Sequence, residues 1–129
     1  MAKKKNNASR ILIVEDDALL LSVLSNTFKK AGFEIATVEN GLEVEEAVKK
    51  ISPNLILLDL IIPGIDGFEV LKRLKASDTS KEIPVIILSN LEDVGDVKSG
   101  RALGADEYFI KANIEVEKIV DYVKKKIEV

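Results

Sequence analysis

The feature that most constrains the fold is an apolar run that ends in a single carboxylate and a turn-forming segment. The run Leu55–Leu58 is unbroken by polar residues, as expected of a strand buried on both faces of a parallel sheet. Asp59 follows it, and Pro63, Gly64 and Gly67 then turn the chain. Burying a carboxylate is costly unless it is paired, metal-bound or at the sheet edge. Ligands collect at the carboxyl ends of parallel strands, so Asp59 is placed like a functional group. The alternative is that Asp59 only caps the turn.

Four further short apolar runs alternate with helical patterns. The predicted strands are 11–14, 33–38, 55–58, 85–88 and 108–110, and the predicted helices are 19–28, 42–51, 68–74, 94–103 and 116–127. Asn113 is the expected cap of the last helix. This alternation predicts an α/β fold, a five-stranded parallel sheet doubly wound by five helices. Right-handed crossovers give the strand order 2-1-3-4-5, with the switch point between the first and third strands.

Composition excludes several classes of function. The 129 residues suggest one domain, and the formal net charge of −3 argues against a general nucleic-acid binder. The absence of Cys excludes disulfides and thiolate chemistry. The absence of His excludes His-based catalysis and most zinc sites.

The first nine residues differ from the rest of the chain. They contain Lys3-Lys4-Lys5 among polar residues, and we expect residues 1–9 to be a disordered basic tail and residues 10–129 to be the folded domain. The run Ile11–Val14 is too short for a secretory signal, and no apolar run is long enough to span a membrane. The cytoplasm is therefore the expected compartment.

Charged and hydroxyl side chains follow four of the five predicted strands. Glu15–Asp17 follow the first strand, Asp59 the third, Ser89 the fourth and Lys111 the fifth, whereas the second strand contributes only Glu39. The order 2-1-3-4-5 brings the four functional strand ends to one edge of the sheet. Because all of these side chains are expected at the same sheet edge, they are better explained as one site than as several unrelated turn residues.

Each of these residues also has a purely structural interpretation. Glu15–Asp17 could form the acidic first turn of a helix, which the helix dipole favours. Ser89 alone is typical of a turn, Lys111 of a solvated strand end and Tyr108 of core packing.

The charge of this strand edge indicates a metal. Glu15, Asp16 and Asp59 carry three negative charges, which Lys111 reduces to two. A divalent cation would neutralise that remainder. Oxygen ligands without His or Cys select Mg²⁺, or Mn²⁺ as a close relative.

Together these residues resemble a known family, the CheY-like receiver domain of bacterial two-component response regulators. The motifs that carry the resemblance are Ile11–Asp17, Asp59–Gly67, Ser89 and Gly104–Lys111, and the match extends over residues 10–127. The family has the flavodoxin-like arrangement of sheet and helices. The resemblance implies a phosphorylation-controlled signalling switch rather than a metabolic enzyme, with at most slow self-phosphorylation and self-dephosphorylation.

The resemblance also implies a metal site and its ligands. Asp16 and Asp59 would bind Mg²⁺ through their side chains and Ile61 through its backbone carbonyl. Glu15 would bind it directly or through water, and it stands where many members have Asp.

The resemblance assigns the phosphoryl group to the same strand edge. Asp59 would be the phosphoacceptor and would take the group from a histidine kinase or a phosphotransfer protein. Lys111 and Ser89 would contact the phosphoryl oxygens, and Tyr108 would move with Ser89 as the switch.

Two departures from the family stand out. Ala112 follows Lys111 where receivers usually have proline, so the Lys111–Ala112 bond is either trans with a shifted loop or a strained cis bond, which would cost about 2.5–4 kcal/mol. Ile61 and Leu91 flank the site where polar residues can position water, which would alter the lifetime of the phosphoryl bond.

Output is expected through protein contacts rather than through direct binding to nucleic acid or membrane. Gly95 and Gly100 would make the helix 94–103 easy to remodel. The face formed by this helix, the strand 108–110 and the last helix would therefore contact a downstream protein or a second copy of the chain.

Three alternatives remain open at this point. The first is a receiver-like interaction module that does not use phosphate. The second is an aspartate-nucleophile phosphatase, although Ile61 stands where its second Asp is expected. The third is a flavodoxin-like cofactor carrier, although Glu15–Asp17 would repel a phosphate and no phosphate-cradling glycine motif is present.

Overall fold

The computed structural model describes residues 8–91 and 93–127. Its five strands are β1 (Arg10–Val14), β2 (Glu34–Val38), β3 (Leu55–Leu58), β4 (Val85–Ser89) and β5 (Glu107–Ile110). Its α-helices are α1 (Ala18–Lys30), α2 (Val44–Ile51), α3 (Gly67–Ala76), α4 (Val94–Ala102) and α5 (Val116–Ile127). Two 3₁₀ turns, η2 (Gly41–Glu43) and η3 (Lys111–Asn113), precede α2 and α5. Each predicted strand boundary lies within one residue of the observed one.

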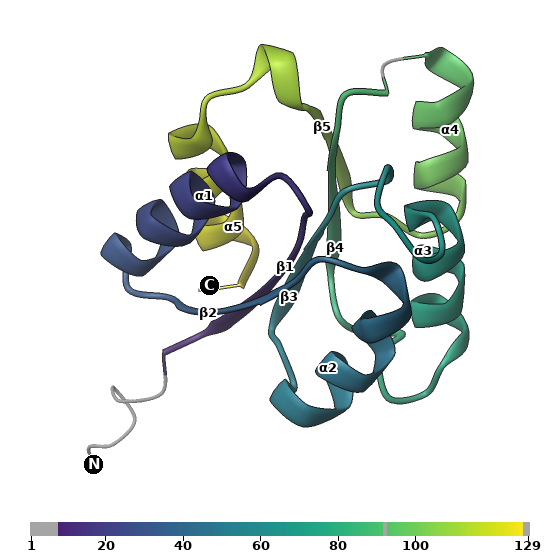
Figure 1. Cartoon of the computed structure of the whole chain (residues 1–129), viewed down its shortest axis with the longest axis horizontal. Coiled ribbons are helices and arrows are strands. Elements are labelled where there is room, and N and C mark those ends of the chain that lie inside the picture. The colour runs from purple at the N-terminus through teal and green to yellow at the C-terminus, as the bar shows by residue number, and fades with distance from the viewer. Residues whose placement is uncertain (1–7, 92, 128–129) are drawn as a thin grey trace.

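The strands form one parallel sheet in the order β2-β1-β3-β4-β5, as predicted (Figure 1). β1 pairs with β2 on one side and with β3 on the other, so the chain reverses its winding direction between β1 and β3. The register places Val14 beside Leu58. The residues that follow β1 and β3 are therefore neighbours at the carboxyl edge of the sheet.

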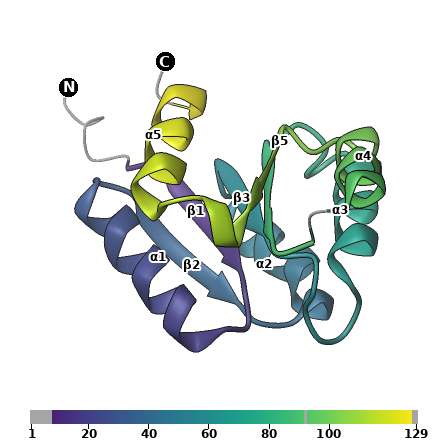
Figure 2. The same ribbon diagram turned by 90° about the horizontal axis from the view of Figure 1, so that it is seen from above.

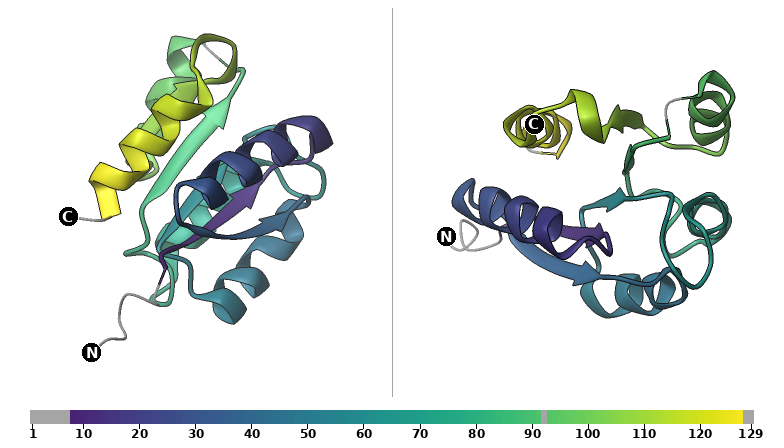
Figure 3. Two further views of the ribbon diagram at one scale, coloured as in Figure 1. Left: turned by 90° about the vertical axis from the view of Figure 1, so that its left-hand side faces the viewer. Right: turned by 45° about the horizontal axis from the view of Figure 1, so that its top comes forward.

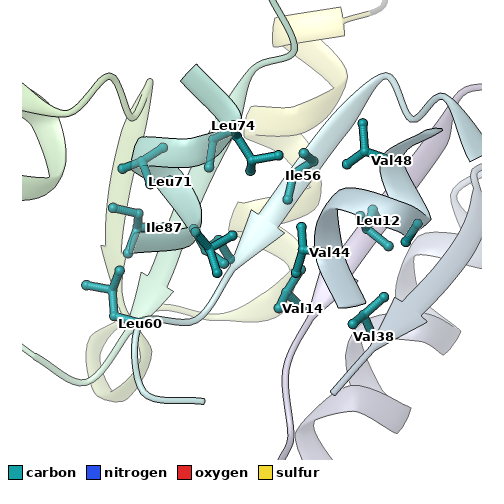
Figure 4. Close-up of a cluster of buried hydrophobic side chains, with 14 of the residues drawn as sticks. Leu12, Val14, Val38, Val44, Val48, Ile56, Leu60, Leu71, Leu74 and Ile87 are labelled. Atoms are coloured by element: carbon teal, nitrogen blue, oxygen red, sulfur yellow. The ribbon is translucent and has the colours of Figure 1, made fainter. Parts of the chain in front are cut away.

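Helices cover both faces of the sheet (Figure 2). α1 and α5 lie side by side on one face, as Figure 3 also shows, and α2, α3 and α4 lie on the other. Alternate residues of each strand point to opposite faces. Ile11 and Ile13 accordingly pack with α1 and α5, whereas Leu12 and Val14 pack with α2 and α3 (Figure 4). Burial on both faces explains why the strands read as unbroken apolar runs.

The two ends of α1 and the start of α5 show how local sequence sets the helix boundaries. The Asp17 side chain caps α1 by accepting hydrogen bonds from the amides of Leu19 and Leu20, at 3.0 and 3.2 Å. Gly32 follows the helix with φ of +101°, a left-handed conformation that favours glycine. The prediction that Asn113 caps the last helix was wrong. Asn113 belongs to η3, and α5 begins three residues later at Val116.

Most of the predicted basic tail, residues 1–7, lies outside the described residues. The Ser9 carbonyl accepts a hydrogen bond of 2.9 Å from the Glu34 amide, so pairing with β2 already begins before Arg10. Across residues 8–91 and 93–127, no helix has the length and apolar character that a membrane crossing requires.

Candidate functional site

Asp59 is the first residue after β3 and is held in place by backbone contacts. Its amide donates to the Val14 carbonyl of β1 at 3.0 Å, and its Oδ1 accepts from the Ile61 amide at 3.2 Å. Gly67 closes the loop, because its amide donates to the Leu60 carbonyl at 2.9 Å. A Cβ at Gly67 would lie 2.5 Å from the Asp59 carbonyl oxygen, so glycine permits α3 to start this close to β3. The Asp59 carboxylate is thus fixed and 4% exposed.

Three carboxylates meet at this point. Glu15, Asp16 and Asp59 each place a carboxylate oxygen within 4.8 Å of the others, as the β1–β3 register predicts. Glu15 is 2% exposed and Asp16 is exposed. The third acidic residue of the run, Asp17, caps α1 instead, so the structural interpretation is correct for it.

Lys111 lies between two of these carboxylates. It is the first residue of η3, and its Nζ lies 2.9 Å from Glu15 Oε1 and 2.9 Å from Asp59 Oδ2. Burial disfavours the charged ammonium, but the two ion pairs outweigh burial, so the pKa of Lys111 is raised and the cation is retained. Burial raises the pKa of Glu15, against the lowering effects of Lys111 and of the Asp17 amide.

The peptide bond between Lys111 and Ala112 is trans, because no cis bond occurs among the described residues. The chain turns through η3 instead of the proline-containing loop that is usual in the family. Of the two conformations that the sequence left open, the structure has the trans bond.

Ser89 and Tyr108 are connected through the backbone of Leu91. The Ser89 hydroxyl is fully buried and accepts a hydrogen bond of 3.3 Å from the Leu91 amide. The Tyr108 hydroxyl donates to the Leu91 carbonyl at 2.6 Å. Burial, followed by the nearby charge of Asp96, raises the pKa of Tyr108. Sequence analysis missed the role of Leu91, because a backbone contact leaves no residue-type signal.

The cluster fits a divalent metal by the chemistry of its donors. It offers carboxylate oxygens and neither His nor Cys, which suits Mg²⁺, Mn²⁺ or Ca²⁺. Both Glu15 oxygens already have partners, since Oε1 pairs with Lys111 and Oε2 accepts from the Asp17 amide at 3.0 Å. Asp16, which is exposed, is the more accessible ligand. The orientation of the Ile61 carbonyl toward a metal stays a prediction.

A family model described as "Response regulator receiver domain" matches residues 11–124. The chain belongs to this family. The sequence is 38% identical over 116 residues to sporulation initiation phosphotransferase F of Bacillus subtilis, covering 90% of this chain and 91% of that protein. It is 33% identical to the DNA-binding dual master transcriptional regulator RpaA of Synechocystis over 89% of this chain, and it spans 47% of the length of RpaA.

Solved receiver structures have the same fold. The phosphorylated cyanobacterial phytochrome response regulator RcpA superposes with a TM-score of 0.80 at 28% identity, covering 95% of this chain and 93% of that one. The Mn²⁺-bound form of the response regulator Rcp1 gives a TM-score of 0.80 at 28% identity, covering 91% and 92%. Membership in the receiver family makes the chain part of a class of phosphorylation-controlled switches. It decides against the phosphatase and the flavodoxin-like carrier considered from sequence.

Proposed function

We propose that this receiver domain takes a phosphoryl group onto Asp59 from a histidine kinase or a phosphotransfer protein in the cytoplasm, with Mg²⁺ or Mn²⁺ bound beside it, and that this changes its protein contacts. One observation carries the proposal. The Asp59 carboxylate is buried at a strand end, within 4.8 Å of two other carboxylates, and its Oδ2 contacts Lys111 at 2.9 Å. This arrangement combines a fixed carboxylate nucleophile with a cation beside it.

The transfer step follows from these positions. An Asp59 oxygen attacks the phosphorus of the donor, a new O–P bond forms, and the bond from phosphorus to the donor breaks with its electron pair leaving on the donor. Phosphoryl transfer depends mainly on positioning and on charge stabilisation. Lys111 supplies a retained positive charge at the carboxylate, and the Asp59 backbone is held by β1. The Ser89 hydroxyl, on the neighbouring strand end, can donate to a phosphoryl oxygen.

The metal ligands that we propose are Asp16, Asp59 and the Ile61 carbonyl, with Glu15 direct or through water. When bound, Mg²⁺ supplies positive charge that offsets the phosphoryl oxygens and the clustered carboxylates. The similarity to the Mn²⁺-bound form of Rcp1 and to phosphorylated RcpA supports both parts of this proposal.

A small phosphodonor tests the chemistry without a kinase. We expect acetyl phosphate with Mg²⁺ to add one phosphoryl mass to the intact protein, and the same mixture with EDTA to add none. After proteolysis, the added phosphoryl mass should be found on a fragment that contains Asp59. A protein that gains no mass and binds no Mg²⁺ would contradict the proposal and favour the phosphate-independent interaction module. A protein that binds Mg²⁺ but gains no mass would indicate blocked access to Asp59 or an unsuitable phosphodonor.

We further propose that the signal leaves through α4, β5 and α5, toward a downstream protein or a second copy of the chain. The Tyr108 ring of β5 packs against α4 at Gly100, where an added Cβ would lie 3.2 Å from Tyr108 Cδ2. Phosphorylation adds charge and acceptor oxygens at Asp59. Rearrangement of Ser89 toward them would disturb the Leu91 link to Tyr108, and through it α4.

Hydrogen exchange measures whether α4 is the element that responds. Gly100 is the one buried residue of the described part of α4, whereas α3 buries four residues and α5 three. We therefore expect α4 amides to exchange faster than those of α3 and α5, and to change most on phosphorylation. Equally strong protection of α4 in both states would contradict this output face.

A further inference from the structure

A turn that contributes no residue to the acidic cluster lies against the loop that follows Asp59. The Asn40–Gly41 turn follows β2, and the Gly41 amide donates to the Pro63 carbonyl at 2.9 Å. A Cβ at Gly41 would collide with the Ile65 carbonyl oxygen. A Cβ at Gly64, whose φ is +90°, would collide with Asn40 Oδ1. Gly41 thus permits the two backbones to approach this closely, and Gly64 leaves room for the Asn40 side chain.

The Asn40–Gly41 turn has its own internal support. The Asn40 side chain accepts from the Leu42 amide at 2.8 Å, and the Asn40 carbonyl accepts from the Glu43 amide at 3.1 Å. Gly41 itself is buried. The turn is therefore a defined structure against which a neighbouring loop can be held.

The loop that it holds carries one of the proposed metal ligands. Residues 60–66 connect Asp59 to α3, and Ile61 lies between the fixed Asp59 and Pro63. At its two ends the loop is tied to β1 and to its own closing residue Gly67. Within the described part of the chain, the Gly41–Pro63 hydrogen bond is the one that joins the middle of this loop to another loop. The Ile61 amide is held by Asp59 Oδ1 at 3.2 Å, and the Gly41–Pro63 hydrogen bond restrains the loop on the other side of the Ile61 carbonyl.

The same turn borders the acidic cluster. Asp16, Asn40 and Pro63 are among the residues that line a cavity of about 590 Å³. The exposed carboxylate of Asp16 and the contact between the two loops thus lie at the same cavity. A shift of Pro63 would change the separation between the Asp16 carboxylate and the loop that carries Ile61.

We propose that the Asn40–Gly41 turn is a positioning element of the metal site. It holds the loop 60–66 so that the Ile61 carbonyl, Asp16 and Asp59 can bind one divalent cation together. The inference rests on the metal site of the proposed function. It assigns a role to the strand end that contributes no charged ligand to the cluster.

The test is the affinity of the protein for Mn²⁺, measured by electron paramagnetic resonance of the free ion. We expect Gly41→Ala to weaken binding about tenfold, in line with residues that orient metal ligands without touching the metal. Gly32→Ala is the matched control. It introduces the same methyl at a left-handed glycine, with nothing within 4 Å of the new Cβ, and at the opposite edge of the sheet. It should lose stability yet keep the wild-type affinity for Mn²⁺.

A second measurement needs no variant and covers the case in which Gly41→Ala does not fold. Coupling between two sites is reciprocal, so a turn that aids metal binding must itself be stabilised by the metal. Mg²⁺ should slow exchange of the Gly41 amide several-fold and leave the Gly32 amide unchanged.

The outcomes separate the two proposals. A wild-type protein that binds no Mn²⁺ would overturn the metal site and this inference with it. A wild-type protein that binds Mn²⁺, with a folded Gly41→Ala of equal affinity or a Gly41 amide indifferent to Mg²⁺, would overturn the positioning role alone.

Discussion

Asp59→Asn should abolish phosphorylation by acetyl phosphate and Mg²⁺ while the protein stays folded. The substitution keeps the shape of the side chain but replaces a carboxylate nucleophile by a neutral amide, which does not attack phosphorus. The fold should survive because Lys111 keeps its second ion pair, with Glu15 at 2.9 Å. Intact mass after a timed incubation measures the adduct, and circular dichroism measures folding.

Asp66→Asn is the matched control for this experiment. Asp66 lies on the loop that follows Asp59, is exposed, and caps α3 by accepting a hydrogen bond from the Glu69 amide at 3.0 Å. Asn caps helices about as well as Asp, so this variant should keep both its stability and the full adduct. An adduct of undiminished size on Asp59→Asn would show that another carboxylate of the cluster is the acceptor.

The fold could be read from the sequence because local and long-range signals agree. Runs such as Leu55–Leu58 are apolar at every position, which suits strands covered on both faces, and the structure buries all four of these residues. Right-handed crossovers leave few ways to order five such strands. The strand order then brings Glu15, Asp16, Asp59 and Lys111 to one edge, and the structure confirms that these four side chains meet.

The remaining features depend on contacts that no residue pattern announces. The Leu91 link between Ser89 and Tyr108 uses backbone groups, which every residue has. The contact of the Asn40–Gly41 turn with Pro63 joins two loops, and the sequence shows each of them as an ordinary turn. The ion pair between Glu15 and Lys111 could not be predicted from the sequence, because it depends on how far the Glu15 side chain reaches across the sheet edge in the folded structure.

Lys111→Met should destabilise the metal-free protein by about 2–3 kcal/mol near neutral pH. Removing one partner of a buried ion pair costs about 3–5 kcal/mol, and we take a lower value because the Lys111 side chain is 17% exposed. The variant leaves Glu15 and Asp59 buried without a neighbouring cation. Urea unfolding in EDTA gives the free energy of unfolding by linear extrapolation.

The pH dependence of this loss identifies its cause. Burial already raises the pKa of Glu15, and Lys111→Met removes the ion pair that opposes the increase. A carboxyl group whose folded pKa lies above its unfolded value destabilises the fold above the folded pKa, and the penalty disappears as the pH falls through it. The difference between variant and wild type should therefore be smaller at about pH 5 than at about pH 7, because the lower pH is nearer to the ordinary pKa of a carboxyl group.

Two further variants decide whether the loss comes from the buried charges. Lys126→Met removes a more exposed pair, with Asp106 at 3.2 Å, and should cost less than about 1 kcal/mol. Asp59→Asn added to Lys111→Met removes one of the two uncompensated carboxylates, so the double variant should regain part of the lost stability. The loss of stability in Lys111→Met could instead be equal at both pH values and unchanged by the added Asp59→Asn. That result would mean that Lys111 stabilises the domain through packing of its aliphatic stem and not through its charge.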